Sequence, residues 1–106
     1  MYKTYVVDIT DTNPHTVLKL PKNRRAEIVF IGWANTGSSA ANVELSQILA
    51  DGATEIPLMT IVAGTGQSDY MTSGSAIASL ERGAELRAKA SAATTLRLTV
   101  TVRFRK

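Results

Sequence analysis

The segment 96–105 has the most regular alternation of apolar and polar positions in the chain. Five apolar residues fall on one phase: Leu96, Leu98, Val100, Val102 and Phe104. Arginine and threonine occupy the other phase, ending with Arg103 and Arg105. A period of two is typical of a strand with one buried face. We therefore expect these five apolar side chains to lie together in the core.

Shorter stretches repeat the same period between turn-like segments. Strands are predicted over residues 4–10, around Leu18 and Leu20, over 43–49, 55–62, 75–80 and 85–90. Pro57 moves its strand toward a sheet edge, because proline cannot donate to a neighbouring strand. Residues 63–74, rich in Gly, Ser and Thr, are predicted to be a loop. Residues 80–93 have some helix formers, but Gly83 and the alternation after it favour a strand.

Residues 24–49 form the central stretch: an apolar run, a small-residue turn and a second apolar run. The turn, Asn35 to Ser39, contains residues that tolerate left-handed backbone or hydrogen-bond to their own backbone. It is predicted to be the loop of a hairpin. Pro21 and Asn23 similarly predict a type II turn, with Asn23 in the left-handed region.

Two apolar phases overlap in this central run. Ala26, Ile28 and Phe30 share one phase and Val29, Ile31 and Trp33 share the other, with Gly32 where they meet. One interpretation is a β-bulge near Gly32 that returns Ile31 and Trp33 to the core. The other is a strand that is apolar on both faces, the second covered by another subunit. In that case Val29, Ile31 and Trp33 form an interface.

Together these patterns predict an all-β protein, an antiparallel β-sandwich of seven to eight short strands with a jelly-roll-like arrangement. Residues 1–106 are expected to form one domain, with 1–20 as an N-terminal strand or arm used in assembly. Alanine supplies much of the 44% hydrophobic content, and aromatic residues only 6%. Such a core is thin, which favours stability gained from subunit association.

Charge and composition indicate which classes of partner the protein is not expected to bind. The net charge of +3 comes from dispersed basic residues without interleaved aromatics, so we expect no nucleic-acid partner. The chain contains no cysteine, which excludes disulfides. No signal peptide or apolar run of about 18 residues is present, so we expect no membrane partner.

We find no pattern that points to catalysis. His15, the only histidine, lies in a turn-like loop beyond Asp8 and Asp11, without a nucleophile in a recognisable arrangement. No metal-ligand spacing occurs, and Gly64-Thr65-Gly66 lacks the rest of a phosphate loop. The protein is expected to be no enzyme and to have no cofactor or metal.

Two groups of residues are candidates for binding. Trp33 and Tyr70 could stack on a sugar ring, although core packing is favoured for Trp33. The basic residues Arg103, Arg105 and Lys106, with Arg24 and Arg25 nearby, could be a solvated strand face or could meet an acidic neighbour in an assembly; both interpretations stay open.

The central stretch resembles a pattern of small bacteriophage virion proteins. It reads Asn23-Arg24-Arg25-Ala26, then Trp33-Ala34-Asn35-Thr36-Gly37-Ser38, then Val43-Glu44-Leu45. A second half is similar too, with Ile61-Val62-Ala63-Gly64, then Leu80-Glu81-Arg82-Gly83, then Lys89-Ala90-Ser91. Lys22-Asn23 stands where those proteins usually have Ala-Gly, and Val62 where they have proline. The resemblance spans residues 20–104.

The resemblance implies a structural virion component located in the virion and made in the host cytoplasm. The expected function is capsid decoration (a cement protein), in which copies associate, most simply as a homotrimer, and bridge subunits of the major capsid protein. The alternative is a receptor- or carbohydrate-binding module of a tail or fibre. The exposure of Trp33 and Tyr70 separates the two, because such a module needs exposed aromatic rings.

Overall fold

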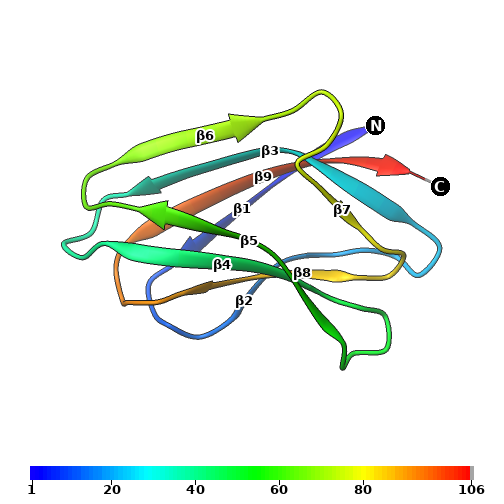
Figure 1. Cartoon of the computed structure of the whole chain (residues 1–106), viewed down its shortest axis with the longest axis horizontal. Coiled ribbons are helices and arrows are strands. Elements are labelled where there is room, and N and C mark those ends of the chain that lie inside the picture. Colours follow the sequence, from blue (N-terminus) through cyan, green and yellow to red (C-terminus); the bar gives the residue numbers. More distant parts are fainter. Residues whose placement is uncertain (106) are drawn as a thin grey trace.

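The computed structural model describes residues 1–105, which form two antiparallel sheets packed face to face (Figure 1). The described chain contains strands and no helix. The strands are β1 (Tyr2–Ile9), β2 (His15–Lys19), β3 (Arg25–Asn35), β4 (Ala41–Ile48), β5 (Glu55–Ala63), β6 (Ser68–Thr72), β7 (Ala78–Leu80), β8 (Glu85–Ala90) and β9 (Leu96–Arg105). The predicted all-β sandwich is confirmed, with nine strands in place of seven or eight.

The strand order is that of a jelly roll. The first sheet, here sheet A, has the order β1-β9-β3-β6, with β7 also paired to β3; the second, sheet B, has the order β2-β8-β4-β5. β6 and β7 pair with opposite halves of β3, so together they act as one strand interrupted by residues 73–77. Counted that way, eight strands make two four-stranded sheets in the jelly-roll order.

The core lies between the sheets and follows the predicted alternation. Leu96, Leu98, Val100 and Val102 of β9 are all at most 1% exposed. Phe104, the fifth expected core residue, is only partly buried, and the Arg24 guanidinium lies 5.6 Å from its ring centroid. Residues 1–20 are integral to the sandwich, because β1 pairs with β9 and β2 with β8.

A β-bulge in β3 decides which apolar residues enter the core. The register with β9 shifts between Ile28 and Phe30, so Val29 is the extra residue. Ile31 and Trp33 then pair with the core positions of β9, and Phe30 is left on the outer face. A bulge was therefore correctly expected, but it lies at Val29 and not at Gly32.

The position of the bulge corrects the predicted interface. Val29 and Ile31 are buried within the molecule, and Trp33 packs against the core, so the three residues do not form an exposed apolar face for another subunit. Gly32 has a different function: a Cβ there would lie 3.0 Å from Cε2 of Phe30. The glycine leaves room for the Phe30 ring over the outer face of sheet A.

The turn after Asn35 does not close a hairpin. β3 belongs to sheet A and β4 to sheet B, so residues 36–40 cross from one layer to the other. Asn35 accepts a hydrogen bond from the Gly37 N–H, as expected of a turn residue, but local chemistry cannot say which strands pair. The predicted loop 63–74 is also wrong in part, because β6 lies inside it; its five residues gain their strand pairing from β3, a long-range partner.

The turns that connect the sheets use glycine where the backbone is left-handed. The turns 64–67 and 81–84 each close with a backbone hydrogen bond and have Gly66 and Gly83 with φ of +71° and +72°. The turn that starts at Pro21 instead closes on Arg24, and no residue other than glycine has positive φ in the described chain. The prediction of a left-handed Asn23 is therefore wrong.

The buried side-chain amide of Asn35 joins three connections at one end of the sandwich. Its Nδ2 donates to the carbonyl oxygens of Ser39 and Ala63, at 2.9 and 3.1 Å. Its Oδ1 accepts from the Gly37 N–H and the Thr94 hydroxyl, at 3.0 and 2.8 Å. All four hydrogen-bonding positions of the amide are thus used, although the residue is only 1% exposed.

The buried side-chain amide of Gln47 also joins separate segments, toward the end of the sandwich opposite Asn35. This side chain, 4% exposed on β4, donates to the Ser79 carbonyl oxygen and accepts from the Glu81 N–H. Since Ser79 lies on β7, the amide links sheet B to sheet A. Buried polar groups with complete hydrogen bonding favour one arrangement of the layers over others.

We expect Asn35→Ala to lower the free energy of unfolding by about 3 kcal/mol, because it leaves several buried donors and acceptors without partners. Asn42→Ala is the matched control: Asn42 is exposed on β4, and its replacement should cost less than about 0.5 kcal/mol. Urea denaturation of both variants measures the difference. Equal stabilities would contradict the structural importance of the Asn35 amide.

Candidate functional site

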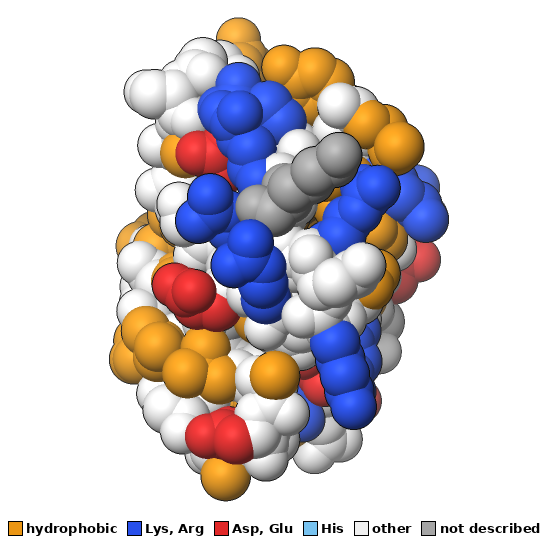
Figure 2. Space-filling view, turned by 90° about the vertical axis from the view of Figure 1, so that its right-hand side faces the viewer, with side chains coloured by type: hydrophobic (Ala, Val, Ile, Leu, Met, Phe, Trp, Pro, Cys, Tyr) orange, Lys and Arg blue, Asp and Glu red, His pale blue; other side chains and the backbone are white. Residues whose placement is uncertain are grey.

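Basic residues gather where β3 begins and β9 ends, a surface here called the basic end (Figure 2). It comprises Lys22, Arg24, Arg25, Arg82, Arg103 and Arg105. The turns 21–24 and 81–84 are held together there, because the Gly83 N–H donates to the carbonyl oxygens of Pro21 and Arg24. The fold therefore brings together charges that are far apart in the sequence. Lys106, which was predicted to join them, lies outside the described residues.

Part of this charge is used within the molecule. Glu27 accepts hydrogen bonds from Nε of Arg105 at 2.7 Å and from Nη2 of Arg103 at 2.8 Å. Arg103 also donates to the carbonyl oxygens of Gly74 and Ser75, so it anchors the segment between β6 and β7. The guanidiniums of Arg105 and then Arg103 hold the pKa of Glu27 below its ordinary value.

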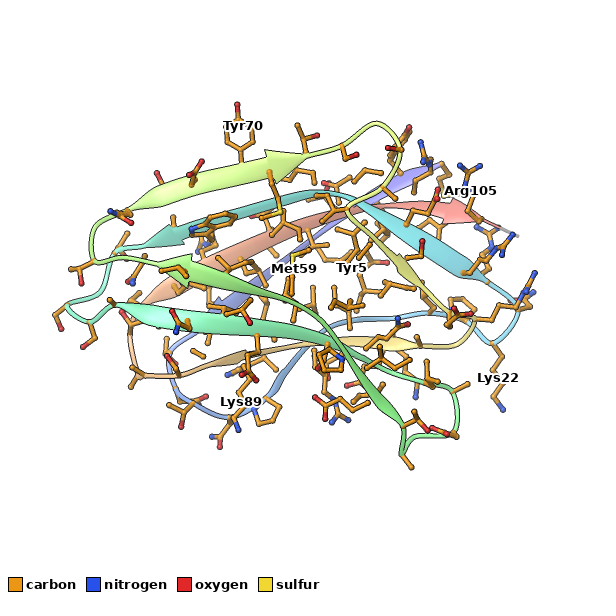
Figure 3. All side chains as sticks on the ribbon, viewed as in Figure 1. Tyr5, Lys22, Met59, Tyr70, Lys89 and Arg105 are labelled. Carbon is orange, nitrogen blue, oxygen red and sulfur yellow. The ribbon has the colours of Figure 1, made fainter. Side chains whose placement is uncertain are left out.

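An aromatic hollow lies on the outer face of sheet A. The rings of Phe30 and Tyr70 stack with centroids 5.8 Å apart, and Tyr70 points away from the sandwich (Figure 3). Beside them is a shallow space of about 500 Å³ whose lining includes Gly32, Asp69 and Arg97. Gly32 has no side chain to fill this space, and the exposed ring of Tyr70 stands beside it.

Trp33 and Tyr70, the predicted stacking residues, both line this hollow, but their side chains differ in position. Tyr70 stands opposite Gly32 in the β3–β6 register, one position away from Trp33, so the two side chains point to opposite faces. Tyr70 is 64% exposed, whereas Trp33 packs against the core. The ring that accompanies Tyr70 is Phe30, which the sequence pattern had assigned to a core phase.

The exposed apolar surface is concentrated on the edges of the sheets. Among the described residues, the exposed large apolar side chains are Met1, Tyr2, Val6, Ile56, Val62 and Tyr70. Met1 directly precedes β1, and the others lie on β1, β5 and β6, each of which pairs with one strand only. β5 is an edge strand as Pro57 predicted, which confirms that expectation.

The residues considered for catalysis form pairs on the surface. His15 Nε2 lies 2.8 Å from Asp11 Oδ1, and this hydrogen bond with the Asn13 N–H lowers the pKa of Asp11. Asp8 is paired with Arg97 at 2.9 Å. Within residues 1–105, no group of three or more His, Asp or Glu side chains is arranged to hold a metal ion. None of the described segments is a helix able to span a membrane.

Comparisons with known proteins give a fold neighbour and no family. No family model matches the sequence, and no curated protein matches it. One similar solved structure is described as "Bacillus endospore appendages form a novel family of disulfide-linked pili". The TM-score is 0.54 with 16% identity, over 96% of this chain and 84% of that chain. At this identity the similarity concerns the fold alone.

Sequence reasoning missed the two buried amides and the Phe30–Tyr70 pair. Asn35 was interpreted as a turn residue, and Gln47 had no visible role. A side-chain amide that shares the apolar phase of a strand is a usable signal: Gln47 has Leu45 and Leu49 two positions away on either side. For Phe30, no local signal reveals that the bulge one residue earlier turns the ring outward.

The Glu27 network predicts a pH dependence. A carboxylate whose pKa is lower in the folded state adds stability above its unfolded pKa, and this contribution is lost as the pH falls through the folded pKa. The melting-temperature difference between the wild type and Glu27→Gln should therefore be largest near neutral pH and shrink between about pH 5 and pH 3. Glu44→Gln, at an exposed site outside this network, is the control and should show a small difference throughout. A pH-independent difference for Glu27→Gln would argue against the ion pairs.

Proposed function

We propose that this protein is a non-enzymatic structural subunit of a multi-copy assembly, and that its role is to decorate and reinforce the capsid shell of a phage. The multi-copy assembly is supported by the apolar side chains that are exposed at the edges of the sheets. The virion part is supported by the resemblance of residues 20–104 to small phage virion proteins.

The observation that carries the proposal is that, within residues 1–105, the exposed large apolar side chains are confined to β1, β5, β6 and the residue before β1. An edge strand presents unpaired N–H and C=O groups, and natural proteins usually protect such edges with charge. Here Val6, Val62 and Tyr70 are all more than half exposed on edge strands. Edges of this kind are suited to contact with other protein chains.

The similar solved structure supports a polymeric role for the fold. Its title describes appendages that form pili, so a jelly roll that aligns with 96% of this chain can serve in a protein polymer. Those pili are disulfide-linked, whereas this chain has no cysteine. Copies of this chain would therefore associate noncovalently, and the assembly would gain strength from many weak contacts.

In the capsid proposal, the basic end contacts the shell. Lys22 and Arg82 are exposed on adjacent turns, beside arginines that are partly engaged with Glu27. A surface with this charge would be attracted to an acidic region of the major capsid protein. The sheet edges remain available for contacts between copies, most simply in a homotrimer at a three-fold position.

A specific observation favours a second function, binding to a carbohydrate or receptor. The exposed Tyr70 ring, stacked on Phe30 above a hollow that includes Asp69 and Arg97, resembles the arrangement that holds a sugar ring: an aromatic plane beside polar side chains. Binding of a soluble glycan that is lost in Tyr70→Ala would support this function, and would place the protein in a tail or fibre.

Co-sedimentation with phage capsids stripped of decoration tests the first proposal. The wild type should bind at low salt and bind less as salt rises, because exposed charges are screened beyond about 8 Å at physiological ionic strength. Lys22→Glu combined with Arg82→Glu should weaken binding about tenfold or more, since it reverses two charges at the basic end. Lys89→Glu, an equally exposed change on β8, is the control and should bind nearly as the wild type does.

Two outcomes would count against this function. A protein that never sediments with capsids at any salt concentration would remove capsid decoration and leave the carbohydrate-binding proposal. If Lys89→Glu weakens binding as much as the double variant does, the basic end is not the contact surface.

A further inference from the structure

The two sheets differ in how well their edges are protected. In sheet B, the register of β2 shifts between Thr16 and Leu18, and β5 contains Pro57 beside another shift. Bulges and proline are devices that prevent an edge from pairing with another chain. In sheet A, β1 pairs without a shift over all of residues 2–9, and β6 over residues 68–72. The edge strands of sheet A therefore have neither of these two devices.

The directions of the sheet A strands allow one copy to continue another. Each successive pair along the order β1-β9-β3-β6 is antiparallel, so β1 and β6 run in opposite directions at the two edges. If a second copy lies beside the first without being inverted, its β1 is antiparallel to the first copy's β6. The alternation of the sheet is then preserved across the boundary.

Side chains on the two edges also match in position. Val6 is opposite Thr99, which is opposite Gly32, which is opposite Tyr70, so Val6 and Tyr70 lie in one row across the outer face. The next row, on the inner face, runs from Tyr5 to Met71. A neighbour placed along these rows brings Val6 to Tyr70 and Tyr5 to Met71. Both are apolar pairs of the kind that stabilise adjacent strands.

Charge does not oppose this pairing. Of the two edge strands, β6 contains the carboxylate of Asp69 and no Lys or Arg, and β1 contains the exposed Lys3, while its Asp8 is already paired with Arg97. The two edges therefore do not carry like net charges, which would repel each other.

We infer that the β1 edge of one copy pairs with the β6 edge of a second copy, so that sheet A continues head-to-tail from subunit to subunit. This inference rests on the proposed multi-copy function and names the partner and the contact. A head-to-tail contact uses two different surfaces, so it closes into a ring, such as a trimer, or extends as a filament. β6 has only five residues, so each contact is small and weak by itself.

Blocking one edge at a time tests the inference. Val6→Lys should disable the β1 edge, and Tyr70→Lys the β6 edge; each alone should reduce association about tenfold or more, because a lysine replaces an apolar contact. Each variant still has one intact edge. An equimolar mixture should therefore form discrete dimers, with the intact β6 edge of the first variant on the intact β1 edge of the second.

Sedimentation velocity over a concentration series measures these species, and circular dichroism checks that each variant is folded. The wild type should form trimers or longer species as its concentration rises. Glu44→Lys changes an exposed residue of β4, a central strand of sheet B away from both proposed edges, and should associate as the wild type does. The same wild-type protein is tested separately for binding to capsids.

Three results would overturn the head-to-tail contact. These are a wild type that stays monomeric at every concentration, a mixture of the two blocked variants that forms no dimer, and a loss of association in Glu44→Lys but not in Tyr70→Lys. The two proposals can fail separately. A monomeric protein that still sediments with capsids would retain the proposed function and exclude this contact.

Discussion

The buried amide of Asn35 is the interaction on which one end of the sandwich depends. Two sheets held only by aliphatic and alanine side chains could slide, because burial of apolar surface has little directionality. Asn35 binds the crossing after β3, the end of β5 and the segment before β9 at fixed distances. Gln47 makes the corresponding link between β4 and β7. These two amides add direction to a core that supplies mainly nonspecific attraction.

The bulge at Val29 separates what is core from what is surface. It returns Ile31 and Trp33 to the interior and places Phe30 outside, where the ring covers Gly32 and stacks on Tyr70. A one-residue change of phase thus produces both a filled core and an aromatic outer face. The surface available to a partner depends on this irregularity as much as on the exposed residues themselves.

The proposed assembly depends on a difference between the edge strands of the two sheets. Sheet B has bulged or proline-containing edges, whereas β1 and β6 of sheet A pair regularly and carry Val6 and Tyr70. The basic end differs from these edges in the kind of contact that it can make, because it offers charge and not strand pairing. A subunit of this design can contact its own copies through one set of residues and a larger shell through another.

The sequence by itself determined the strand character of most of the chain, because the alternation in β9 and the effect of Pro57 are local properties of the backbone and its side chains. It also indicated a bulge in β3 as one of two interpretations of the overlapping apolar phases. Only the tertiary structure decided that the bulge is at Val29, that residues 36–40 join two sheets, and that β6 is a strand. The same holds for the partners of Asn35 and for the basic end. Each of these depends on which distant segments become neighbours, and a one-dimensional pattern does not specify that choice.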